Sequence, residues 1–522
     1  MADRSTERVV AFMDLGTNSI RALIVRLNPN GSYTILTKQK ELVRLGEGEF
    51  EHGNLLPEAI DRTVNVCRKF TELARSFGAG EIVAFATSAT REAQNRDELL
   101  RRLEEEAGLA FGVISGREEA RLIYLGVASA VDLGDRSMLF IDIGGGSTEV
   151  GVGDQHGYRL LESLQVGALR LTNLLVRPDR EGVVTPENYH EIRRHVRAEG
   201  IHPLHRLKNQ KVDVSYGCSG TIQTLASTAR HLCHPGVPET EYVLAHADLQ
   251  RIAAYLCSLP LEERRRVPGM VADRADILIG GAAILDVLME ELGIPEIRIS
   301  DRTLRDGMLV DYLSRTEGFP HAEPLSVRRR SVIQLGRSCG IDEEHALTVV
   351  RLALELYDSA AREGLHACGP WEREMLEYAA YLHDVGSFIS FRGHQIHSRY
   401  IIGNADLLGF DQGETAVLAL IARYHRKKVP GKKEADLEPL TSRNRRAVRI
   451  LSTLLRYAEH LDRTHADLVR HARFTHCGDD EVCLEVGCPG DCSLEVWAAR
   501  SDADAFAKVF GKKLVVASVS PK

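Results

Sequence analysis

Two short segments of the sequence place an aspartate, glycine and small hydroxyl residues in the same order. The first reads Asp-Leu-Gly-Thr-Asn-Ser from Asp14 to Ser19, and the second reads Asp-Ile-Gly-Gly-Gly-Ser-Thr from Asp142 to Thr148. Glycine allows a tight turn that approaches a ligand closely, and the backbone N–H groups and hydroxyls of such a turn can donate to phosphate oxygens. An aspartate at the end of a strand can hold a hydrated divalent cation. Each segment therefore has the chemistry of a phosphate-binding turn.

Apolar runs surround both segments and predict the elements that position them. Residues 22–25 follow the first turn and residues 150–152 follow the second, and each turn is also preceded by an apolar run. Two apolar strands joined by a polar turn form a β-hairpin. A single Asp-x-Gly is more often an ordinary turn, but two copies between apolar runs indicate an internal duplication. Two such tips facing one cleft would hold a polyphosphate from both sides.

The composition bounds the class of protein. A chain of 522 residues is too long for one core, so two to four domains are expected, and 44% hydrophobic with 27% charged residues is ordinary for a soluble globular protein. The polar start argues against a signal peptide, and the lack of an apolar run of about 20 residues argues against a membrane span. The sequence therefore predicts a cytoplasmic location. The net charge of −8 argues against general nucleic-acid binding.

The ten cysteines are sparse for a chain of this length, which favours reduced thiols. Four of them cluster near the end of the chain, at Cys477, Cys483, Cys488 and Cys492. No Cys-x-x-Cys pair occurs among these four, so their spacing favours separate thiols over a zinc site, without excluding the metal.

The pattern of apolar residues changes twice along the chain. Strand and helix patterns alternate up to about residue 314, which is typical of an α/β fold, and the second copy begins near Met138. Apolar residues then recur at helical spacing, which predicts an all-helical region. From about residue 466 we expect strands at 481–486, 493–499 and 514–519 and a short helix at 503–510.

The motifs of the first half resemble those of the exopolyphosphatase/guanosine pentaphosphate phosphohydrolase (Ppx/GppA) family. Five segments carry the resemblance in the family's order, over roughly residues 8–312: 14–21, 86–93, 114–121, 141–149 and 217–221. The resemblance implies two actin-like (ribonuclease H-like) α/β domains, an all-helical HD-like domain and a small α/β C-terminal tail. The expected bounds are 1–130 with a return segment at about 301–314 for domain I, 131–300 for domain II, 315–465 for the helical domain and 466–522 for the tail.

The activity that the resemblance implies is hydrolysis of a phosphoanhydride. This reaction needs cations and donors on the phosphate oxygens and a carboxylate that activates water. By resemblance, Glu119 is the catalytic base; Asp142 and Glu149 also hold the metal or the water, and Asp14 is the matching carboxylate of the first turn. Asp14, Asp142 and Glu149 are thus the expected Mg²⁺ ligands. The expected phosphate-binding residues are Gly16, Thr17, Asn18, Ser19, Arg21, Arg91, Gly144, Gly145, Gly146, Ser147, Thr148, Gly217, Ser219, Gly220 and Thr221. The family prefers a third glycine where Cys218 or Ser219 stands.

The helical half contains a second set of residues that could bind a metal. His383-Asp384, with His345 before it and Asp462 after it, resembles the HD phosphohydrolase domain, whose separated His, His-Asp and Asp residues bind a divalent cation. His394, His397 and His425 lie in segments similar to the histidine-rich stretch of that domain. Gln395 replaces an expected histidine and Glu459 an expected aspartate, so either Glu459 or Asp462 could serve. We expect a weakened single-metal site, separate from the phosphatase metal.

The predicted function is Mg²⁺-assisted removal of a terminal phosphate from inorganic polyphosphate, with the 5′-phosphate of guanosine pentaphosphate as the alternative. The resemblance also implies a homodimer and no specific nucleic-acid or membrane partner. A sugar kinase of the same fold would need an acceptor and an adenosine pocket, and Glu119 and Arg91 argue against it. A non-catalytic sensor would have lost Glu119 or Asp142. Basic runs could extend the cleft as a cationic track: 328–330, 423–428, 432–433 and 443–449.

Overall fold

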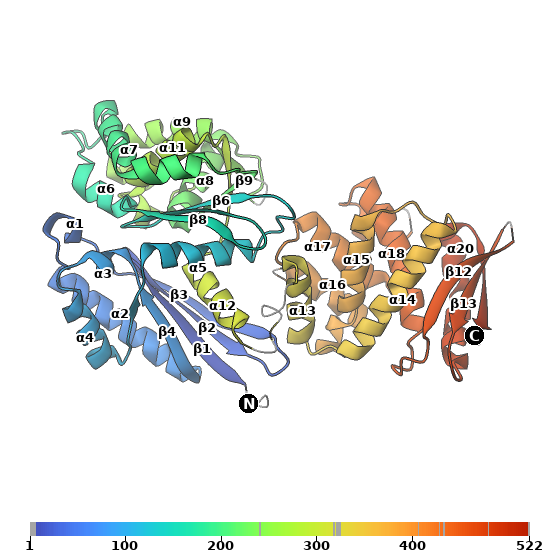
Figure 1. Ribbon diagram of the computed structural model, residues 1–522. Helices are drawn as coiled ribbons and strands as arrows, with labels where there is room; N and C mark the ends of the chain where they lie inside the picture. Colours follow the sequence, from blue (N-terminus) through green and yellow to red (C-terminus); the bar gives the residue numbers. More distant parts are fainter. Residues whose placement is uncertain are drawn as a thin grey trace. The chain divides into compact units, whose positions relative to one another are not determined.

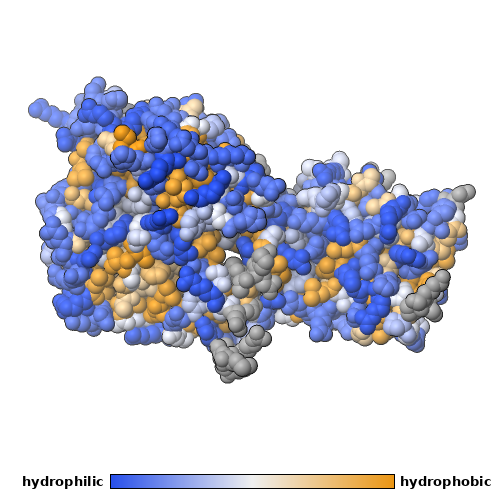
Figure 2. Space-filling model, viewed as in Figure 1, coloured by the Kyte–Doolittle hydropathy of each residue, from blue (hydrophilic) through white to orange (hydrophobic). Residues whose placement is uncertain are grey.

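The computed structural model describes residues 7–239, 242–316, 319, 325–405, 407–426, 429–431, 434–478 and 480–519. The chain divides into two compact units, one made of Met1–Pro29 and Tyr33–Ala322 and the other of Asn30–Ser32 and Glu323–Lys522 (Figure 1). Hydrophilic residues cover most of the visible face of each unit, and apolar residues are confined to separate patches (Figure 2). Among the described helices, none combines the length and the apolar character that a bilayer crossing requires.

The first unit begins with a five-stranded sheet in the order β3-β2-β1-β4-β5. Its strands are β1 (Arg8–Leu15), β2 (Ser19–Leu27), β3 (Tyr33–Leu42), β4 (Ala79–Ala86) and β5 (Gly112–Val113). Its helices are α1 (Glu49–His52), α2 (Pro57–Ser76), α3 (Ser88–Glu92), α4 (Arg96–Ala107), α5 (Gly116–Ala128) and, from much later in the chain, α12 (Leu304–Ser314). Strand β1 is apolar on both faces because each face is covered: Ala11 and Met13 belong to one buried core and Val10 and Phe12 to another.

A second sheet in the same unit repeats this plan in the order β10-β11-β9-β6-β7-β8. Its strands are β6 (Met138–Ile143), β7 (Thr148–Gly153), β8 (Tyr158–Leu164), β9 (Val214–Cys218), β10 (Val243–Ala245) and β11 (Glu296–Ile299). Its helices are α6 (Ala168–Leu175), α7 (Pro186–Lys208), α8 (Ser219–Cys233), α9 (His246–Cys257), α10 (Leu261–Arg264), the 3₁₀ turn η2 (Ala272–Arg274) and α11 (Leu278–Leu292). As β1 pairs antiparallel with β2 and parallel with β4, β6 pairs antiparallel with β7 and parallel with β9. The duplication predicted from the two turns thus extends to the sheets.

The return segment expected at about 301–314 contains the helix α12, which packs against the first sheet and α5. Leu304, Met308 and Leu309 join the core that contains Leu122 of α5. The two helices cross at glycine: a Cβ atom on Gly307 would stand 1.7 Å from the Leu122 carbonyl oxygen. This close contact fixes α12 against α5.

The second unit is helical and carries a small sheet. Its helices are α13 (Val327–Ser338), α14 (Glu343–Arg362), α15 (Pro370–Leu382), η4 (Val385–Phe388), α16 (His394–Asn404), α17 (Gln412–Tyr424), η5 (Ala435–Leu437), α18 (Ser442–His460), α19 (Ser493–Ser501) and α20 (Ala503–Phe510). The sheet has the order β12-β13-β14, with strands His471–Gly478, Glu481–Gly487 and Lys513–Val519.

The C-terminal region differs from the sequence expectation in four ways. Residues 493–499 form a helix and not the expected strand, because Val496 and Ala499 are buried on one helical face while Trp497 is exposed. The strand β12 was not predicted. The buried residues of the sheet share one core with the long helices, so the expected tail is not a separate domain. Cys488 and Cys492 form a disulfide, contrary to the expectation of reduced thiols throughout.

Candidate active site

The two phosphate-binding turns have the same backbone geometry. In the first hairpin the Gly16 N–H donates to the Ser19 carbonyl (3.0 Å), and in the second the Gly144 N–H donates to the Ser147 carbonyl (2.9 Å). Each bond closes a four-residue turn between the antiparallel strands. The sequence prediction of two equivalent hairpins is therefore confirmed.

The residues at the base of the two turns differ in charge. Asp14 is the cross-strand partner of Arg21 in the β1–β2 hairpin, and Asp142 is the partner of Glu149 in the β6–β7 hairpin. The aspartates thus occupy equivalent places, but one faces a cation and the other faces a second carboxylate.

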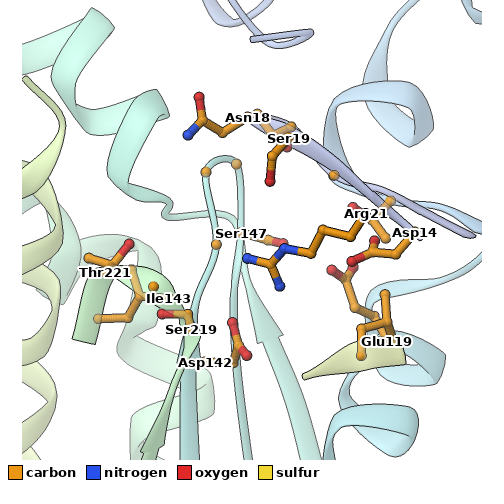
Figure 3. A pocket seen from close by; sticks show the side chains of 18 of the residues that line it. Asp14, Asn18, Ser19, Arg21, Glu119, Asp142, Ile143, Ser147, Ser219 and Thr221 are labelled. Atoms are coloured by element: carbon orange, nitrogen blue, oxygen red, sulfur yellow. The ribbon is translucent and has the colours of Figure 1, made fainter. Parts of the chain in front are cut away.

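Both hairpin tips line one cleft in the first unit (Figure 3). The other walls come from α5, from the β9–α8 turn and from the segment before α11. The lining residues are Asp14, Gly16, Thr17, Asn18, Ser19, Arg21, Thr87, Glu119, Ile123, Asp142, Ile143, Gly144, Gly145, Gly146, Ser147, Ser219, Gly220, Thr221, Arg274, Ile277 and Leu304. The structure therefore brings together most of the residues predicted to bind phosphate.

The glycines of the second turn are required by the close approach of the first domain. A Cβ atom on Gly146 would lie 2.5 Å from the Ser88 hydroxyl oxygen and 2.8 Å from the Thr17 hydroxyl oxygen. The Gly145 carbonyl accepts from the N–H groups of Leu169 and Arg170 at the start of α6 (2.9 and 3.0 Å). Helix α6 thus fixes the tip from behind, and the absence of side chains lets the two tips meet.

Arg21 extends from the first hairpin toward the second, with Asp14 and Glu119 close together beside it (Figure 3). Three more cations lie near it. The pKa of Lys40 falls to about 8 because burial and the charges of Arg274, Arg21 and Arg305 disfavour its ammonium form. Burial, followed by the charge of Arg21, lowers the pKa of Arg274 to about 10. This side of the cleft concentrates positive charge and is suited to a polyanion.

Sequence reasoning missed these three cations. Lys40 is an exposed residue near the end of β3, next to the exposed Glu41, and such a pattern indicates only a solvated strand face. Arg274 ends the short 3₁₀ turn η2 shortly before the buried helix α11, and no spacing in the sequence connects it to the hairpins.

Glu119 is held at the start of α5 by its neighbours. The Ser115 side chain caps this helix by accepting from the Glu118 N–H (3.1 Å). Glu119 itself is buried, and its Oε2 lies 3.3 Å from Nη1 of Arg91, which also donates to the Ile114 carbonyl (2.8 Å). Arg91 does not line the cleft; it orients the carboxylate that does. Its predicted role in phosphate binding therefore changes to that of a positioning residue.

The pKa of Glu119 is raised well above its ordinary value. Burial is the main cause, followed by the negative charges of Glu149 and Asp14, while Arg91 acts in the opposite direction. A buried carboxyl with a raised pKa beside other carboxylates in a cleft is typical of a general acid or base. Glu118, by contrast, pairs with Arg121 outside the cleft.

Three other predicted residues lie behind the cleft wall rather than on it. Glu149 is buried and accepts from the Ser163 hydroxyl (2.8 Å), and burial and then Asp142 raise its pKa to about 7. Thr148 donates its hydroxyl to the Val166 carbonyl (2.6 Å). Gly217 is inside β9, where a Cβ atom would lie 2.6 Å from Ile222. These residues shape the site, but the structure does not place them against a phosphate.

The β9–α8 turn departs from the family pattern at a strained position. Ser219 has φ 72°, in the left-handed region that favours glycine, so the chain keeps the turn where the family would have glycine. At the next residue, Gly220, a Cβ atom would lie 2.4 Å from the guanidinium carbon of Arg274. The turn therefore admits the arginine to the cleft.

The expected Mg²⁺ ligands do not form a ready-made cage. Among the described residues, the only sets of three ligand atoms within 4.8 Å of one another lie in the second unit. A magnesium ion bound with substrate phosphate needs only one or two carboxylates and water, which Asp142 and Asp14 offer. The pKa of Asp142 is raised to about 6, chiefly by burial. A cation beside it would favour the ionised carboxylate.

The helical unit brings His345, His383 and Glu459 together. Their ligand atoms lie within 4.8 Å of one another, and all three residues are buried. Asp462, expected as a ligand, instead accepts from Nδ1 of His345 (2.7 Å) and positions that ring. Glu459 takes its place because its Oε2 lies 3.2 Å from Nε2 of both histidines.

The predicted cationic track is weakened by pairing. Arg328 forms ion pairs with Glu374 and Glu414, and Arg443 pairs with Glu372. The remaining lysines of the track, Lys427, Lys428, Lys432 and Lys433, lie outside the described residues.

A duplicated α/β unit with a phosphate-binding hairpin in each half, both lining one polar cleft, defines an actin-like phosphoryl-transfer enzyme. The profile of the Ppx/GppA phosphatase family matches residues 23–316, and the profile of domain III of the same family matches residues 327–488. The chain belongs to the Ppx/GppA phosphatase family, whose members are phosphoanhydride hydrolases.

Solved structures of similar proteins agree with this assignment. An exopolyphosphatase from Cytophaga hutchinsonii is 26% identical with a TM-score of 0.54, over 60% of this chain and 100% of that one. An exopolyphosphatase-like protein is 27% identical with a TM-score of 0.53, over 59% of this chain and 98% of that one.

Proposed function

We propose that this protein is an exopolyphosphatase, which hydrolyses the terminal phosphoanhydride bond of inorganic polyphosphate with Mg²⁺ assistance. The observation that supports this most is the buried carboxyl of Glu119 in a cleft that also contains both hairpin tips and Arg21. The cleft supplies the donors, the cations and the carboxylate that the reaction requires, all on rigid elements.

Each group has a defined task in this proposal. The hydroxyls of Ser19 and Ser147 and the N–H groups of the tips donate to phosphate oxygens, and Arg21 neutralises charge between the two tips. Asp142, with Asp14 near it, would hold Mg²⁺, which neutralises phosphate charge when bound. Glu119 accepts the proton of the attacking water, and Arg91 keeps its carboxylate in place.

The composition of the cleft favours inorganic polyphosphate over guanosine pentaphosphate. None of the residues that line the described cleft is aromatic, and its apolar members are Ile123, Ile143, Ile277 and Leu304. A guanine base is commonly held by stacking on an aromatic side chain, whereas a polyphosphate needs only cations and donors. Arg21 and Arg274, which both line the cleft, meet that need.

The proposal is tested by measuring phosphate release from long polyphosphate, guanosine pentaphosphate and ATP with one enzyme preparation, with and without Mg²⁺. We expect the highest kcat/KM for polyphosphate and loss of release when Mg²⁺ is chelated. A higher kcat/KM for guanosine pentaphosphate would favour the alternative substrate. Light scattering on the same preparation tests the proposed homodimer.

A further inference from the structure

A second cavity of the first unit adjoins Arg91, the residue that orients Glu119. Its volume is about 480 Å³, and its walls come from α3, from the start of α5, from β8 and the residue after it, and from α7. The polar side chains of its lining are those of Arg91, Arg117, Glu162, Ser163, Gln165 and Arg206. No described residue of this lining also lines the cleft with the two hairpin tips, so the two cavities are separate.

The walls of this second cavity carry an excess of positive charge. Arg91, Arg117 and Arg206 line it, and Glu162 is the one carboxylate among the described lining residues. Glu162 is paired with Arg206, with 2.7 Å between its Oε2 and Nη2 of the arginine. Three arginines against one carboxylate leave an excess of two positive charges, which suits an oxyanion.

Two of these arginines keep donors that no described protein group uses. Nη1 of Arg91 donates to the Ile114 carbonyl (2.8 Å) and contacts Glu119, whereas its Nε and Nη2 have no hydrogen bond with a described residue. Arg117 is exposed, and its side chain has neither an ion pair nor a hydrogen bond with a described residue. A guanidinium group offers its donors as a planar fork that matches the oxygens of a phosphate. The cavity therefore has donors that are available to a ligand.

The wall between the two cavities contains groups that hold the proposed catalytic carboxyl groups. A Cβ atom on Gly116 would lie 2.3 Å from Oγ of Ser163 and 3.6 Å from Nη2 of Arg91, so the start of α5 contacts β8 at this wall. Arg91 holds Glu119 (3.3 Å), and the Ser163 hydroxyl donates to Glu149 (2.8 Å). A ligand in the second cavity would thus contact the two residues that position Glu119 and Glu149.

We propose that this cavity is a second oxyanion site, which binds orthophosphate between Arg91, Arg117 and Arg206 and slows turnover by drawing Arg91 away from Glu119. The choice of orthophosphate rests on the proposed function, in which every turnover releases this anion. An anion beside Arg91 competes with the Glu119 carboxylate for one guanidinium group, and a displaced carboxylate is a poorer base for water.

The first test is the binding of orthophosphate to full-length protein, measured by isothermal titration calorimetry without Mg²⁺. The Arg21→Gln variant is the background, because it weakens phosphate binding in the other cleft. One site per chain is expected, and adding Arg117→Gln and Arg206→Gln should raise its Kd by about 10-fold or more. This measurement needs no turnover, so its outcome is independent of whether the protein hydrolyses polyphosphate.

The matched control combines Arg68→Gln with Arg194→Gln. It removes the same charge from exposed positions outside both cavities, and Arg194 belongs to α7, as Arg206 does. The control should bind orthophosphate as the background does. An unchanged Kd in the folded variant with Arg117→Gln and Arg206→Gln would overturn the proposal. Circular dichroism establishes folding, and if this variant does not fold, Arg117→Gln alone decides.

The second test separates the two cavities by the kind of inhibition. Loss of long polyphosphate is followed at increasing orthophosphate. Orthophosphate in the cleft competes with substrate and raises KM, whereas orthophosphate in the second cavity lowers kcat. Arg117→Gln with Arg206→Gln should keep the wild-type kcat without orthophosphate and lose only the fall in kcat. A fall in kcat equal to that of wild type would contradict the proposal.

Tripolyphosphate distinguishes a product site from a subsite for the substrate chain. It is titrated into the same Arg21→Gln background, with and without Arg117→Gln and Arg206→Gln. Orthophosphate should depend on the two arginines at least as strongly as tripolyphosphate does. Tighter binding of tripolyphosphate that is lost with these arginines, without a change for orthophosphate, would make the cavity a substrate subsite and overturn the proposal.

Discussion

The two hairpins of the first unit share a backbone but not a charge pattern. Both turns are closed by the same N–H to carbonyl bond, and both place an aspartate at the same register. Across from that aspartate the first hairpin has Arg21 and the second has Glu149. The first tip carries the side chains of Thr17 and Asn18 where the second has two glycines.

This difference shows how a duplicated scaffold acquires two tasks. In the proposed function, the arginine makes the first hairpin a phosphate clamp, and the second carboxylate makes the other hairpin suited to a cation or a proton. The charges also act across the cleft: burial raises the pKa of both Asp142 and Glu119, Arg21 opposes the rise at Asp142, and Glu149 adds to the rise at Glu119. Each hairpin therefore acts on a carboxyl group outside itself, and the following experiments test the difference between the two hairpins.

The largest effect is expected for Glu119→Gln. The amide cannot accept a proton from water, so kcat for polyphosphate should fall by about 10²–10⁴-fold with little change in polyphosphate binding. Steady-state phosphate release and a direct binding assay measure the two quantities. Glu118→Gln is the matched control and should retain activity, and a kcat of Glu119→Gln within about 10-fold of wild type would remove Glu119 from the role of base.

Arg21→Gln tests the clamp of the first hairpin. Loss of the guanidinium between the tips should lower kcat/KM by about 10²-fold, because a preorganised donor to the phosphate is removed. Arg26→Gln, on the same strand but outside the cleft, serves as control. Equal kinetics of Arg21→Gln and Arg26→Gln would contradict the assignment.

Gly146→Ala tests why the second tip has no side chains. The added methyl would collide with the Ser88 and Thr17 hydroxyls and push the tips apart, so kcat/KM should fall by about 10-fold or more through misplaced phosphate donors. Gly157→Ala, where a Cβ atom meets open space, should behave as wild type. Retained activity in Gly146→Ala would mean that the tips need not meet.

Glu149→Gln tests the charge that the second hairpin applies to Glu119. Removing a negative neighbour should lower the pKa of Glu119, so the acidic limb of the kcat/KM profile should move to lower pH. The shift is measured from pH profiles of the variant and wild type in Mg²⁺. An unmoved acidic limb would show that Glu149 does not act on the base.

The same variant should change stability in the metal-free protein. The pKa of Glu149 is raised from 4.5 to about 7 by burial, so its contribution to stability is present below pH 4.5 and is lost as pH rises through about 7. The free energy of unfolding, measured with urea, should therefore fall between pH 5 and 8 by roughly 1–3 kcal/mol more in wild type than in Glu149→Gln. The same pH dependence of the free energy of unfolding in both proteins would contradict the prediction that ionised Glu149 destabilises the fold.

The smallest effect is expected from His383→Ala combined with Asp384→Ala. The double variant should lose transition metal but leave Mg²⁺-dependent phosphate release from short polyphosphate within about 2-fold of wild type, since the two sites share no residue. Metal analysis and the release assay on one sample measure both. Loss of short-chain turnover in a folded double variant would indicate that hydrolysis takes place in the helical unit.

The parts predicted well from the sequence are those in which local residues dictate the backbone. Asp-x-Gly between apolar runs determines each hairpin, so both turns, their registers and most of the cleft could be predicted from residues 14–19 and 142–148. Glu119 was identified through the resemblance of the Gly-Arg-Glu-Glu-Ala-Arg segment to the family's motif, and its place at the start of a helix was also predicted.

The parts that were missed depend on contacts between distant segments. Arg274 reaches the cleft from a short 3₁₀ turn, and no local spacing connects it to the hairpins. Glu459 and Asp462 are both near the end of α18, and only the direction of their side chains decides which one meets His383. His394 and His425 converge through the packing of α16 and α17, which sequence spacing does not reveal.

The contact between α12 and α5 has a consequence for the order in which the protein is made. Leu122 and its neighbours on α5 are covered by Leu304, Met308 and Leu309, which the ribosome adds only after the whole second sheet has been synthesised. Domains tend to fold as units while the chain emerges, N-terminal parts first. Here the first domain must wait for its last helix, so the helix that carries Glu119 is locked in place only after both halves of the cleft exist.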